Sequence, residues 1–220
     1  MGAKQRLFEA ILAQFVRPHG FAGRLTGWKM ALRPSNRKRN RWAVGLLEVQ
    51  PRDRVLEVGF GPGIAIRQLA RRATDGVVCG IDHSEVMVRQ ATARNRVAVE
   101  HGRVDLRLGS ALDLGDFSDM FDKVLVVNNL GMWPDPDARL KELRGAVRPG
   151  GRVAIVSQPR CPGATAATTE RVGVETERLL RDAGFIRIRR ELLNLRPPVV
   201  CVLAEAPTAE GSEPSEHDLR

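Results

Sequence analysis

The sequence predicts an α/β fold built on a mostly parallel sheet of seven strands, with helices on both faces and an antiparallel hairpin at its C-terminal end. Two patterns carry this prediction. From residue 53 onward, short apolar runs alternate with amphipathic stretches, which is typical of a parallel sheet covered by helices. The last two apolar runs are joined by a few residues that include Pro197 and Pro198, too few for a crossover helix, so this pair should be antiparallel.

The expected strands are 54–58, 77–82, 104–108, 123–128, 152–157, 185–191 and 199–204. The expected helices that follow the first strand are 63–73, 84–98, 136–147 and 169–183. Residues 113–122 leave little room for a full helix between the third and fourth strands.

Two further helices are expected before the first strand. The first covers residues 4–16, where apolar side chains recur at helical spacing, and the second runs from about residue 35 to residue 49. In the second helix, Trp42, Leu46 and Val49 should face inward. We interpret residues 1–50 as an N-terminal helical cap over the ligand cleft of a domain at 51–205, with a disordered acidic tail at 206–220.

Length and composition favour a cytoplasmic protein with no membrane span. A chain of 220 residues suits one α/β domain with a modest addition, and it has neither an 18-residue apolar run nor a signal peptide. Cys79, Cys161 and Cys201 are far apart, without the spacing of metal ligands, so no metal site is expected. Cys79 and Cys201 lie in apolar runs and should be buried.

The net charge of +9 is concentrated near the N-terminus. Residues 24–41 carry seven basic side chains and no acidic one. Such a run could contact nucleic acid, an anionic membrane or an anionic substrate, or it could be a solvated helix face. Within it, Arg33, Arg37 and Arg41 recur every four residues on one side of the second helix.

The glycine-rich segment after the first strand indicates a nucleotide-type cofactor. Gly59, Gly61 and Gly63 occupy its first, third and fifth positions, whereas a dinucleotide fingerprint needs a glycine at the sixth, which is Ile64. Asp82 closes the second strand, where a carboxylate can accept hydrogen bonds from both hydroxyls of a ribose. The pairing therefore predicts an adenosine-containing cofactor, with a nicotinamide or flavin site and a glycine-rich turn without a ligand as the alternatives.

Five segments between about residues 40 and 205 form an ordered series of motifs: VLEVGFGPG (55–63), GIDHSEVM (80–87), 121–128, WPDP (133–136) and 143–153. This series resembles that of the class I S-adenosylmethionine-dependent methyltransferases, most closely small bacterial members similar to quinone-biosynthesis methyltransferases. The resemblance implies a Rossmann-like fold, S-adenosyl-L-methionine as the cofactor, and methyl transfer to an oxygen, nitrogen or carbon nucleophile of a small molecule.

The resemblance also implies roles for individual residues in cofactor binding. Gly59, Gly61 and Gly63 would form the floor under the cofactor, Glu57 would hold the methionine ammonium, and Asp82 would hold the ribose. His83 would flank the adenine or ribose, or it is simply a turn residue before a helix. The remaining cofactor positions are Ser110, where the family commonly has an acid, its neighbour Ala111, and Asn128.

The acceptor pocket is expected between the N-terminal helices and the loop after the fourth strand, because ligands bind at the carboxyl ends of strands in open α/β sheets. Asn129 could orient a hydroxyl or amine of the acceptor, and Met132 and Trp133 could form a wall, although Trp133 could instead fix the next helix. Arg33, Arg37 and Arg41 would select an anionic or polar acceptor, or would hold the cap in place. His19 is the candidate general base, with an ordinary polar loop residue as the alternative.

Three alternatives compete with a small-molecule methyltransferase. A nucleic-acid (RNA) methyltransferase could use residues 24–41 as a basic arm, but the chain has no Tyr and only three Trp for base stacking. A cofactor-binding regulatory subunit without catalysis is favoured slightly by Ser110. An NAD-dependent oxidoreductase is opposed by Ile64 and by the terminal hairpin. The acceptor and the oligomeric state stay open.

Overall fold

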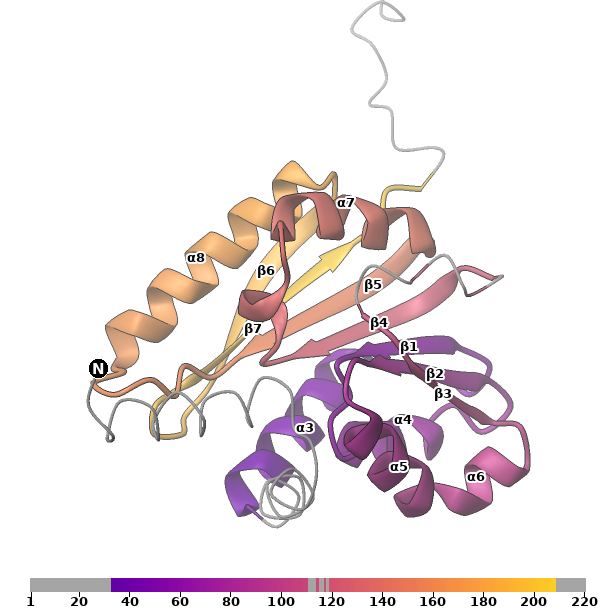
Figure 1. The fold of residues 1–220 in the computed structure, drawn as a ribbon. Coiled ribbons are helices and arrows are strands. Elements are labelled where there is room, and N and C mark those ends of the chain that lie inside the picture. Colours follow the sequence, from indigo (N-terminus) through magenta and orange to yellow (C-terminus); the bar gives the residue numbers. More distant parts are fainter. Residues whose placement is uncertain (1–32, 111–113, 115–116, 118, 209–220) are drawn as a thin grey trace, which may run out of the picture.

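The computed structural model describes residues 33–110, 114, 117 and 119–208, and it has the expected α/β architecture (Figure 1). The sheet order is β3-β2-β1-β4-β5-β7-β6, with β1 to β5 parallel and β7 antiparallel to both of its neighbours. The strands are β1 (Arg54–Val58), β2 (Val77–Asp82), β3 (Val104–Leu108), β4 (Phe121–Val127), β5 (Val147–Ser157), β6 (Ile186–Leu193) and β7 (Val199–Glu205). The helices are α3 (Pro34–Leu46), α4 (Ile64–Ala70), α5 (Glu85–Arg94), α6 (Arg96–Glu100), α7 (Pro136–Ala146) and α8 (Ala166–Asp182), with a short 3₁₀ turn η2 (Leu130–Met132).

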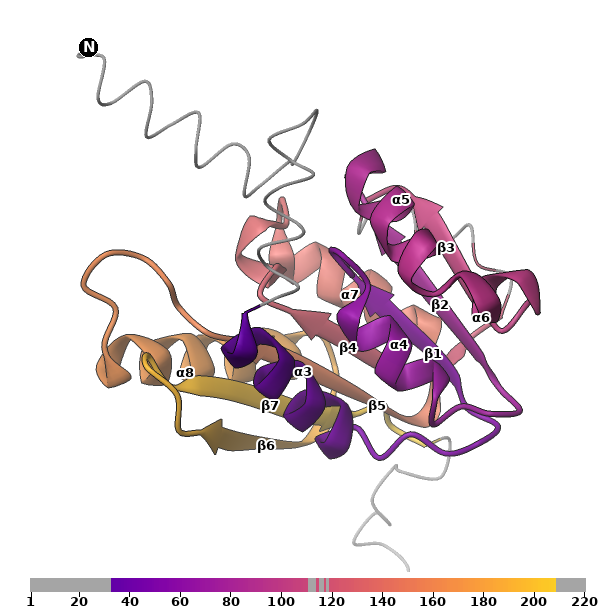
Figure 2. The same ribbon diagram turned by 90° about the horizontal axis from the view of Figure 1, so that it is seen from below.

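Helices cover both faces of the sheet (Figure 2). One core cluster lies under α7 and α8, and the other lies under α3, α4 and α5. Side chains of β1 alternate between them: Leu56 and Val58 belong to the first cluster, and Val55 belongs to the second. Because side chains of a strand point alternately to opposite faces, Glu57 shares the face of Val55, on the side of α3 and α4.

The strand predictions are confirmed, and the bounds of β1, β2 and β3 agree with the expected ones. The single helix predicted at 84–98 is wrong, because α5 ends at Arg94 and α6 begins at Arg96. The break falls at Asn95, whose side-chain Nδ2 donates to the carbonyl oxygens of Ala91, at 2.8 Å, and Gly63, at 3.2 Å. An asparagine side chain that bonds nearby carbonyls competes with helix continuation.

Helix α3 presents a different face to the sheet from the predicted one. Its buried residues are mostly polar or small: Asn36, Arg39, Asn40, Ala43 and Val44. Trp42 and Leu46 are only partly buried, while Val49, after the helix, is buried as expected. The helix lies against α4 and against β4, β5 and β7. Its N-terminal half therefore meets the polar loops at the carboxyl ends of these strands.

The division into a cap at 1–50, a domain at 51–205 and a tail at 206–220 remains a prediction. Helix α3 is the part of the proposed cap that the structure describes, while residues 1–32 and 209–220 lie outside the described residues. No helix among the residues that the structure describes is both long and apolar enough to cross a membrane. Cys79 and Cys201 are buried as predicted, and burial raises the pKa of the two thiols to about 11 and about 12.

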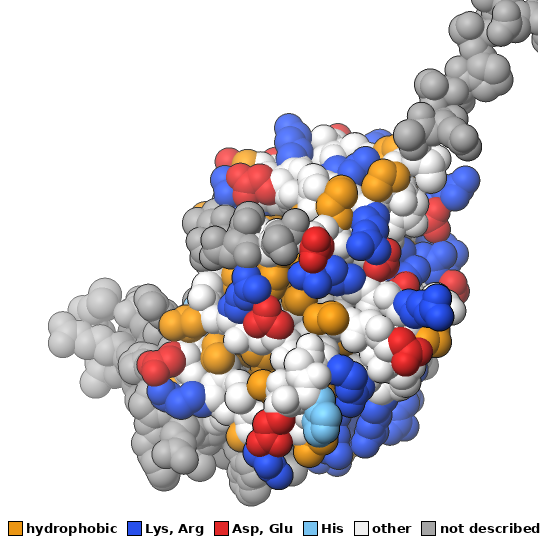
Figure 3. Space-filling model, turned by 90° about the vertical axis from the view of Figure 1, so that its right-hand side faces the viewer, with side chains coloured by type: hydrophobic (Ala, Val, Ile, Leu, Met, Phe, Trp, Pro, Cys, Tyr) orange, Lys and Arg blue, Asp and Glu red, His pale blue; other side chains and the backbone are white. Residues whose placement is uncertain are grey.

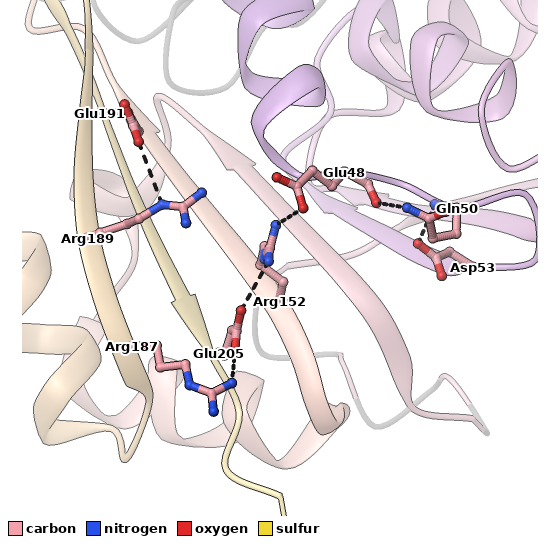
Figure 4. Close-up of polar contacts among 8 residues, drawn as sticks. All are labelled: Glu48, Gln50, Asp53, Arg152, Arg187, Arg189, Glu191 and Glu205. Atoms are coloured by element: carbon pink, nitrogen blue, oxygen red, sulfur yellow. Dashed lines mark hydrogen bonds and ion pairs between the residues drawn. The ribbon is translucent and has the colours of Figure 1, made fainter.

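A chain of ion pairs anchors the C-terminal end of α3 to the sheet (Figure 4). Arg152 on β5 donates to Glu48, just after α3, at 2.7 Å and to Glu205 on β7 at 3.1 Å. Arg187 on β6 donates to the other oxygen of Glu205 at 2.9 Å. The end of α3 is thus joined to three neighbouring strands.

Candidate cofactor site

The turn after β1 brings bare backbone to an open cavity. Gly59 and Gly61 adopt positive φ angles of 70° and 53°, which glycine adopts without strain. A Cβ at Gly59 would lie 1.6 Å from Nδ2 of Asn129, whereas a Cβ at Gly61 would meet nothing within 4 Å. The same Nδ2 of Asn129 donates to the carbonyl oxygen of Val58 at 2.6 Å. Gly59 therefore allows the close approach of Asn129, and the bare Cα of Gly61 faces open space.

Helix α5 supports this turn from behind. Arg94 donates to the carbonyl oxygen of Pro62, and Asn95 donates to that of Gly63. A Cβ at Gly63 would lie 2.7 Å from Cβ of Ala91, so the third glycine lies against the helix. Sequence reasoning missed this supporting role of Arg94 and Asn95. An asparagine inside an otherwise continuous helical pattern was the available signal.

Asp82, at the end of β2, also holds the glycine turn after β1 in place. The residue is 5% exposed, with Oδ2 accepting from the N–H of Gly61 at 2.8 Å and Oδ1 from that of Ser84 at 2.9 Å. Burial raises the pKa of Asp82, and the two backbone hydrogen bonds oppose that shift. His83 Nδ1 lies 4.0 Å from Oδ1 of Asp82. Asp82, the residue predicted to bind the ribose, is therefore in direct contact with Gly61, the central glycine of the turn.

Glu57 is buried in the floor of the same site. It is 2% exposed, and its Oε2 has no hydrogen-bond partner among the residues that the structure describes. Burial and the nearby Asp82 raise the pKa of Glu57 well above its usual range, against a lowering effect of the N–H of Ile66. The carboxyl group thus favours its neutral form until a cation approaches.

A pocket joins Glu57 to the N-terminal half of α3. It is lined by Asn36, Arg39, Asn40, Glu57, Gly59, Phe60, Gly61, Pro62, Ile64 and Val127. Three of its side chains hold buried polar atoms without a partner in the described part of the chain: Arg39 Nε, Asn40 Oδ1 and Glu57 Oε2. A polar ligand in this cavity would supply the hydrogen-bond partners that these atoms lack among the described residues.

Arg39 is another residue of this site that the sequence did not predict. It is 5% exposed, and its Nη1 donates to Oε1 of Gln158, just after β5, at 3.1 Å. Burial lowers the pKa of Arg39 to about 10, with a further lowering effect of Arg160, so the guanidinium is still charged at neutral pH. The predicted acceptor residue Arg37 is exposed instead.

The charges of the pocket fit the amino-acid end of a ligand. A carboxyl group at Glu57 and an amide oxygen at Asn40 match an ammonium, while the guanidinium of Arg39 matches a carboxylate. Asp82 lies across the glycine turn from this pocket, where the adenosine end of the same ligand would lie. The residues present therefore fit a cofactor that carries both groups.

The remaining predicted cofactor residues lie nearby or outside the described residues. Gly109 N donates to the carbonyl oxygen of Asp82 at 3.0 Å, which brings Ser110 beside the end of β2. Asn128 follows β4 with a φ of 56°, and its Oδ1 accepts from the N–H of Gln158 at 2.7 Å. Ala111 and the candidate base His19 lie outside the described residues.

The predicted acceptor residues after β4 differ in exposure. Met132 is 44% exposed, whereas Trp133 is partly buried against the core cluster under α7 and α8. Asn129 is buried and holds the end of β1, and its Oδ1 has no partner among the described residues. This packing of Trp133 favours the alternative that it fixes the next helix.

Comparisons with known proteins agree with this geometry. Residues 55–151 match the family model described as a methyltransferase domain. The chain is 34% identical over 184 residues to the uncharacterized methyltransferase YdaC of Bacillus subtilis, with 83% of this chain and 98% of the relative covered. It is 30% identical over 128 residues to the ubiquinone/menaquinone biosynthesis C-methyltransferase UbiE of Geotalea daltonii, with 57% of this chain and 54% of that protein covered.

Solved structures show the same fold. A SAM-dependent methyltransferase from Aquifex aeolicus superposes with a TM-score of 0.65 at 20% identity, covering 83% of this chain and 98% of that one. The N-methyltransferase NodS from Bradyrhizobium japonicum, in complex with S-adenosylhomocysteine, superposes with a TM-score of 0.63 at 17% identity, covering 82% of this chain and 91% of that one.

Proposed function

Because the chain belongs to the S-adenosylmethionine-dependent methyltransferase family, we propose that it transfers the methyl group of this cofactor to an oxygen, nitrogen or carbon nucleophile of a small molecule. The observation that carries the proposal is a pocket beside Gly61 that is lined by Glu57, Arg39 and Asn40, each of which holds a buried polar atom without a partner among the described residues. The methionine end of the cofactor carries an ammonium and a carboxylate. These two groups would be the hydrogen-bond partners of the unpartnered atoms in this pocket.

Glu57 and Asn40 would accept hydrogen bonds from the ammonium, and Arg39 would donate to the carboxylate. Asp82 would accept from the ribose hydroxyls through the remaining lone pairs of the two oxygens that accept from Gly61 and Ser84. His83 and Ser110, at the ends of β2 and β3, would lie beside the nucleoside. Together these contacts would fix the cofactor at both ends, so that its sulfur can move little.

The cofactor supplies a methyl group on a sulfonium, whose leaving group is already activated. The chain then needs only to align the acceptor in line with the methyl group and to exclude water. We assign this task to α3 and to the loop of Asn129, Met132 and Trp133, which lie at the carboxyl ends of the central strands. His19 remains the proposed general base.

The relatives support a small molecule as the acceptor, since the name of the UbiE relative specifies ubiquinone and menaquinone biosynthesis. The nucleic-acid alternative rests on residues 24–41, of which 33–41 are described. On the face seen in Figure 3, basic side chains are interspersed with acidic ones. Binding to RNA that weakens steeply with salt would favour this alternative.

Calorimetric titration with S-adenosylmethionine, S-adenosylhomocysteine and NAD tests the proposal. The two sulfur compounds should bind at micromolar concentration and NAD should not. Asp82→Ala should weaken binding at least about tenfold, because each hydrogen bond to a charged group contributes about 1.5–3 kcal/mol. Binding of NAD alone, or of none of the three, would contradict the proposal.

A further inference from the structure

A second arginine, Arg160, lies next to the cofactor pocket, on the loop after β5. The Nη2 of Arg160 donates to Oε1 of Gln158 at 2.8 Å and to Oδ1 of Asn36, in the first turn of α3, at 2.9 Å. Gln158 is buried, and its Oε1 also accepts from Nη1 of Arg39. Two guanidinium groups therefore share one neutral amide oxygen.

This arrangement brings the two positively charged side chains of Arg39 and Arg160 close together. No ion pair to Arg39 or Arg160 occurs in the described part of the chain. Burial lowers the pKa of Arg160, and the nearby Arg33 lowers it further. Mutual repulsion of these cations disfavours the folded chain unless an anion joins them.

The two arginines differ in where they point. Arg39 is buried and lines the pocket that holds Glu57, so the cofactor's carboxylate would satisfy it. Arg160 does not line that pocket, and it is exposed. The three neutral oxygens that orient its Nη2 belong to Gln158, Asn36 and, at 3.3 Å, Ser35 Oγ. Arg160 is thus held in place by weak partners while part of its guanidinium stays open to solvent.

We propose that Arg160, with Arg33 beside it, binds an anionic group of the methyl acceptor, so that the acceptor is a small molecule carrying a carboxylate or a phosphate. The proposal rests on the proposed methyltransferase function. Arg160 follows β5 and Arg33 precedes α3, so both belong to the two segments that meet at the carboxyl end of the sheet. Arginine suits this task, because its planar fork matches carboxylate and phosphate oxygens.

The test uses the full chain saturated with S-adenosylhomocysteine, so that Arg39 is already engaged. Benzoate and phenyl phosphate are titrated calorimetrically as anionic probes, and benzamide is the neutral counterpart of benzoate. At least one anionic probe should bind, and benzamide should bind much more weakly. Arg160→Gln should weaken the anionic probe roughly tenfold, as expected for loss of a charge-assisted contact. The stronger of the two anionic probes then identifies the acceptor as a carboxylate or a phosphate compound.

Two controls separate the outcomes. Arg71→Gln changes an exposed arginine that follows α4, away from this cluster, and should leave probe binding unchanged. Arg160→Lys keeps the charge and should retain part of the affinity. Affinity for S-adenosylhomocysteine within twofold of wild type shows that each variant is folded.

Failure of this inference is distinguishable from failure of the proposed function. If S-adenosylhomocysteine itself does not bind to the wild type, the methyltransferase proposal fails. If it binds but neither anionic probe does, or Arg160→Gln and Arg71→Gln behave alike, Arg160 is not an anion site and the inference is overturned.

Discussion

The arginines at the two ends of α3 have different kinds of hydrogen-bond partner. Near its C-terminal end, Arg152 donates to two carboxylates, those of Glu48 and Glu205 (Figure 4). Burial lowers the pKa of Arg152, but these two partners outweigh it and raise the pKa above its ordinary value. In the N-terminal half, the side chain of Arg39 donates, among the described residues, only to the amide of Gln158, and burial lowers its pKa.

This difference separates structural charge from charge that is kept for a ligand. A cation that is paired with acids is already compensated and contributes to the fold. A buried cation with a neutral partner costs stability, because its desolvation is not repaid within the chain. The second arrangement is expected where a binding site must remain ready for an anion.

The largest expected effect comes from removing the positive charge of Arg39. Arg39→Met should weaken binding of S-adenosylhomocysteine at least about 100-fold, since charge-assisted hydrogen bonds of about 1.5–3 kcal/mol each would be lost. Its thermal midpoint should be unchanged or higher, because an apolar side chain replaces an uncompensated cation. Calorimetry and thermal unfolding measure the two quantities.

Arg152→Met is the matched control for Arg39→Met. It should leave the affinity for S-adenosylhomocysteine within twofold of wild type, while lowering the thermal midpoint by roughly 3 °C. If Arg39→Met instead loses stability and keeps its affinity, Arg39 is a structural residue and the contrast between the two ends of α3 is wrong.

Glu57 carries the opposite charge in the same pocket, and Glu57→Gln should weaken cofactor binding roughly tenfold through loss of one charged hydrogen bond. The free protein should become more stable at neutral pH. Because the pKa of Glu57 is raised in the folded chain, the folded state binds a proton that the unfolded state releases above about pH 4.5, so stability falls as pH rises through that window. Glutamine removes this penalty.

Thermal unfolding of wild type and Glu57→Gln at a series of pH values measures this effect. The advantage of the variant should grow from about pH 4.5 upward and disappear in more acidic solution. A constant difference across the whole range would mean that packing, and not ionisation, distinguishes the two side chains.

A smaller effect is expected in the proton balance of binding. An ammonium beside Glu57 favours its carboxylate, so binding of S-adenosylhomocysteine should release a proton, and the affinity should tighten as pH rises until Glu57 is ionised in the free protein. The change is at most about tenfold per pH unit. Titrations in phosphate and Tris buffers, which differ in ionisation enthalpy, measure the released proton. Glu57→Gln should abolish it, and an unchanged release would assign the proton to another group.

The sequence predicted β1, β2 and β3 well because their signals are local. Three consecutive strands had the expected bounds, and the turn containing Gly61 and the strand-end Asp82 are in direct contact. Each of these features depends on a short run of residues: an apolar strand, glycines that permit positive φ, and a carboxylate at the next strand end.

The half of the site built by α3 could not be predicted in the same way. Its apolar residues Trp42 and Leu46 suggested one inward face, whereas the structure buries Arg39 and Asn40. Which face of a short helix is buried depends on what it packs against, and the polar side chains of α3 contact Gln158 and Arg160, on a loop distant in sequence. The bond from Arg39 to Gln158 crosses 119 positions, which no local pattern reveals.

The smallest expected effect concerns the support of the glycine turn. Asn95→Ala removes the buried bonds to Gly63 and Ala91 and should lower stability by about 1–2 kcal/mol, with each bond contributing about 1 kcal/mol. Cofactor affinity should fall only a few fold, because Asp82 still holds the turn through Gly61. Arg89→Ala, on the exposed side of α5, is the control and should change neither quantity beyond a few tenths of a kcal/mol. Urea unfolding and calorimetry measure both variants. Loss of affinity in Asn95→Ala as large as in Arg39→Met would show that the backbone position of the turn, more than the charges of the pocket, determines cofactor binding.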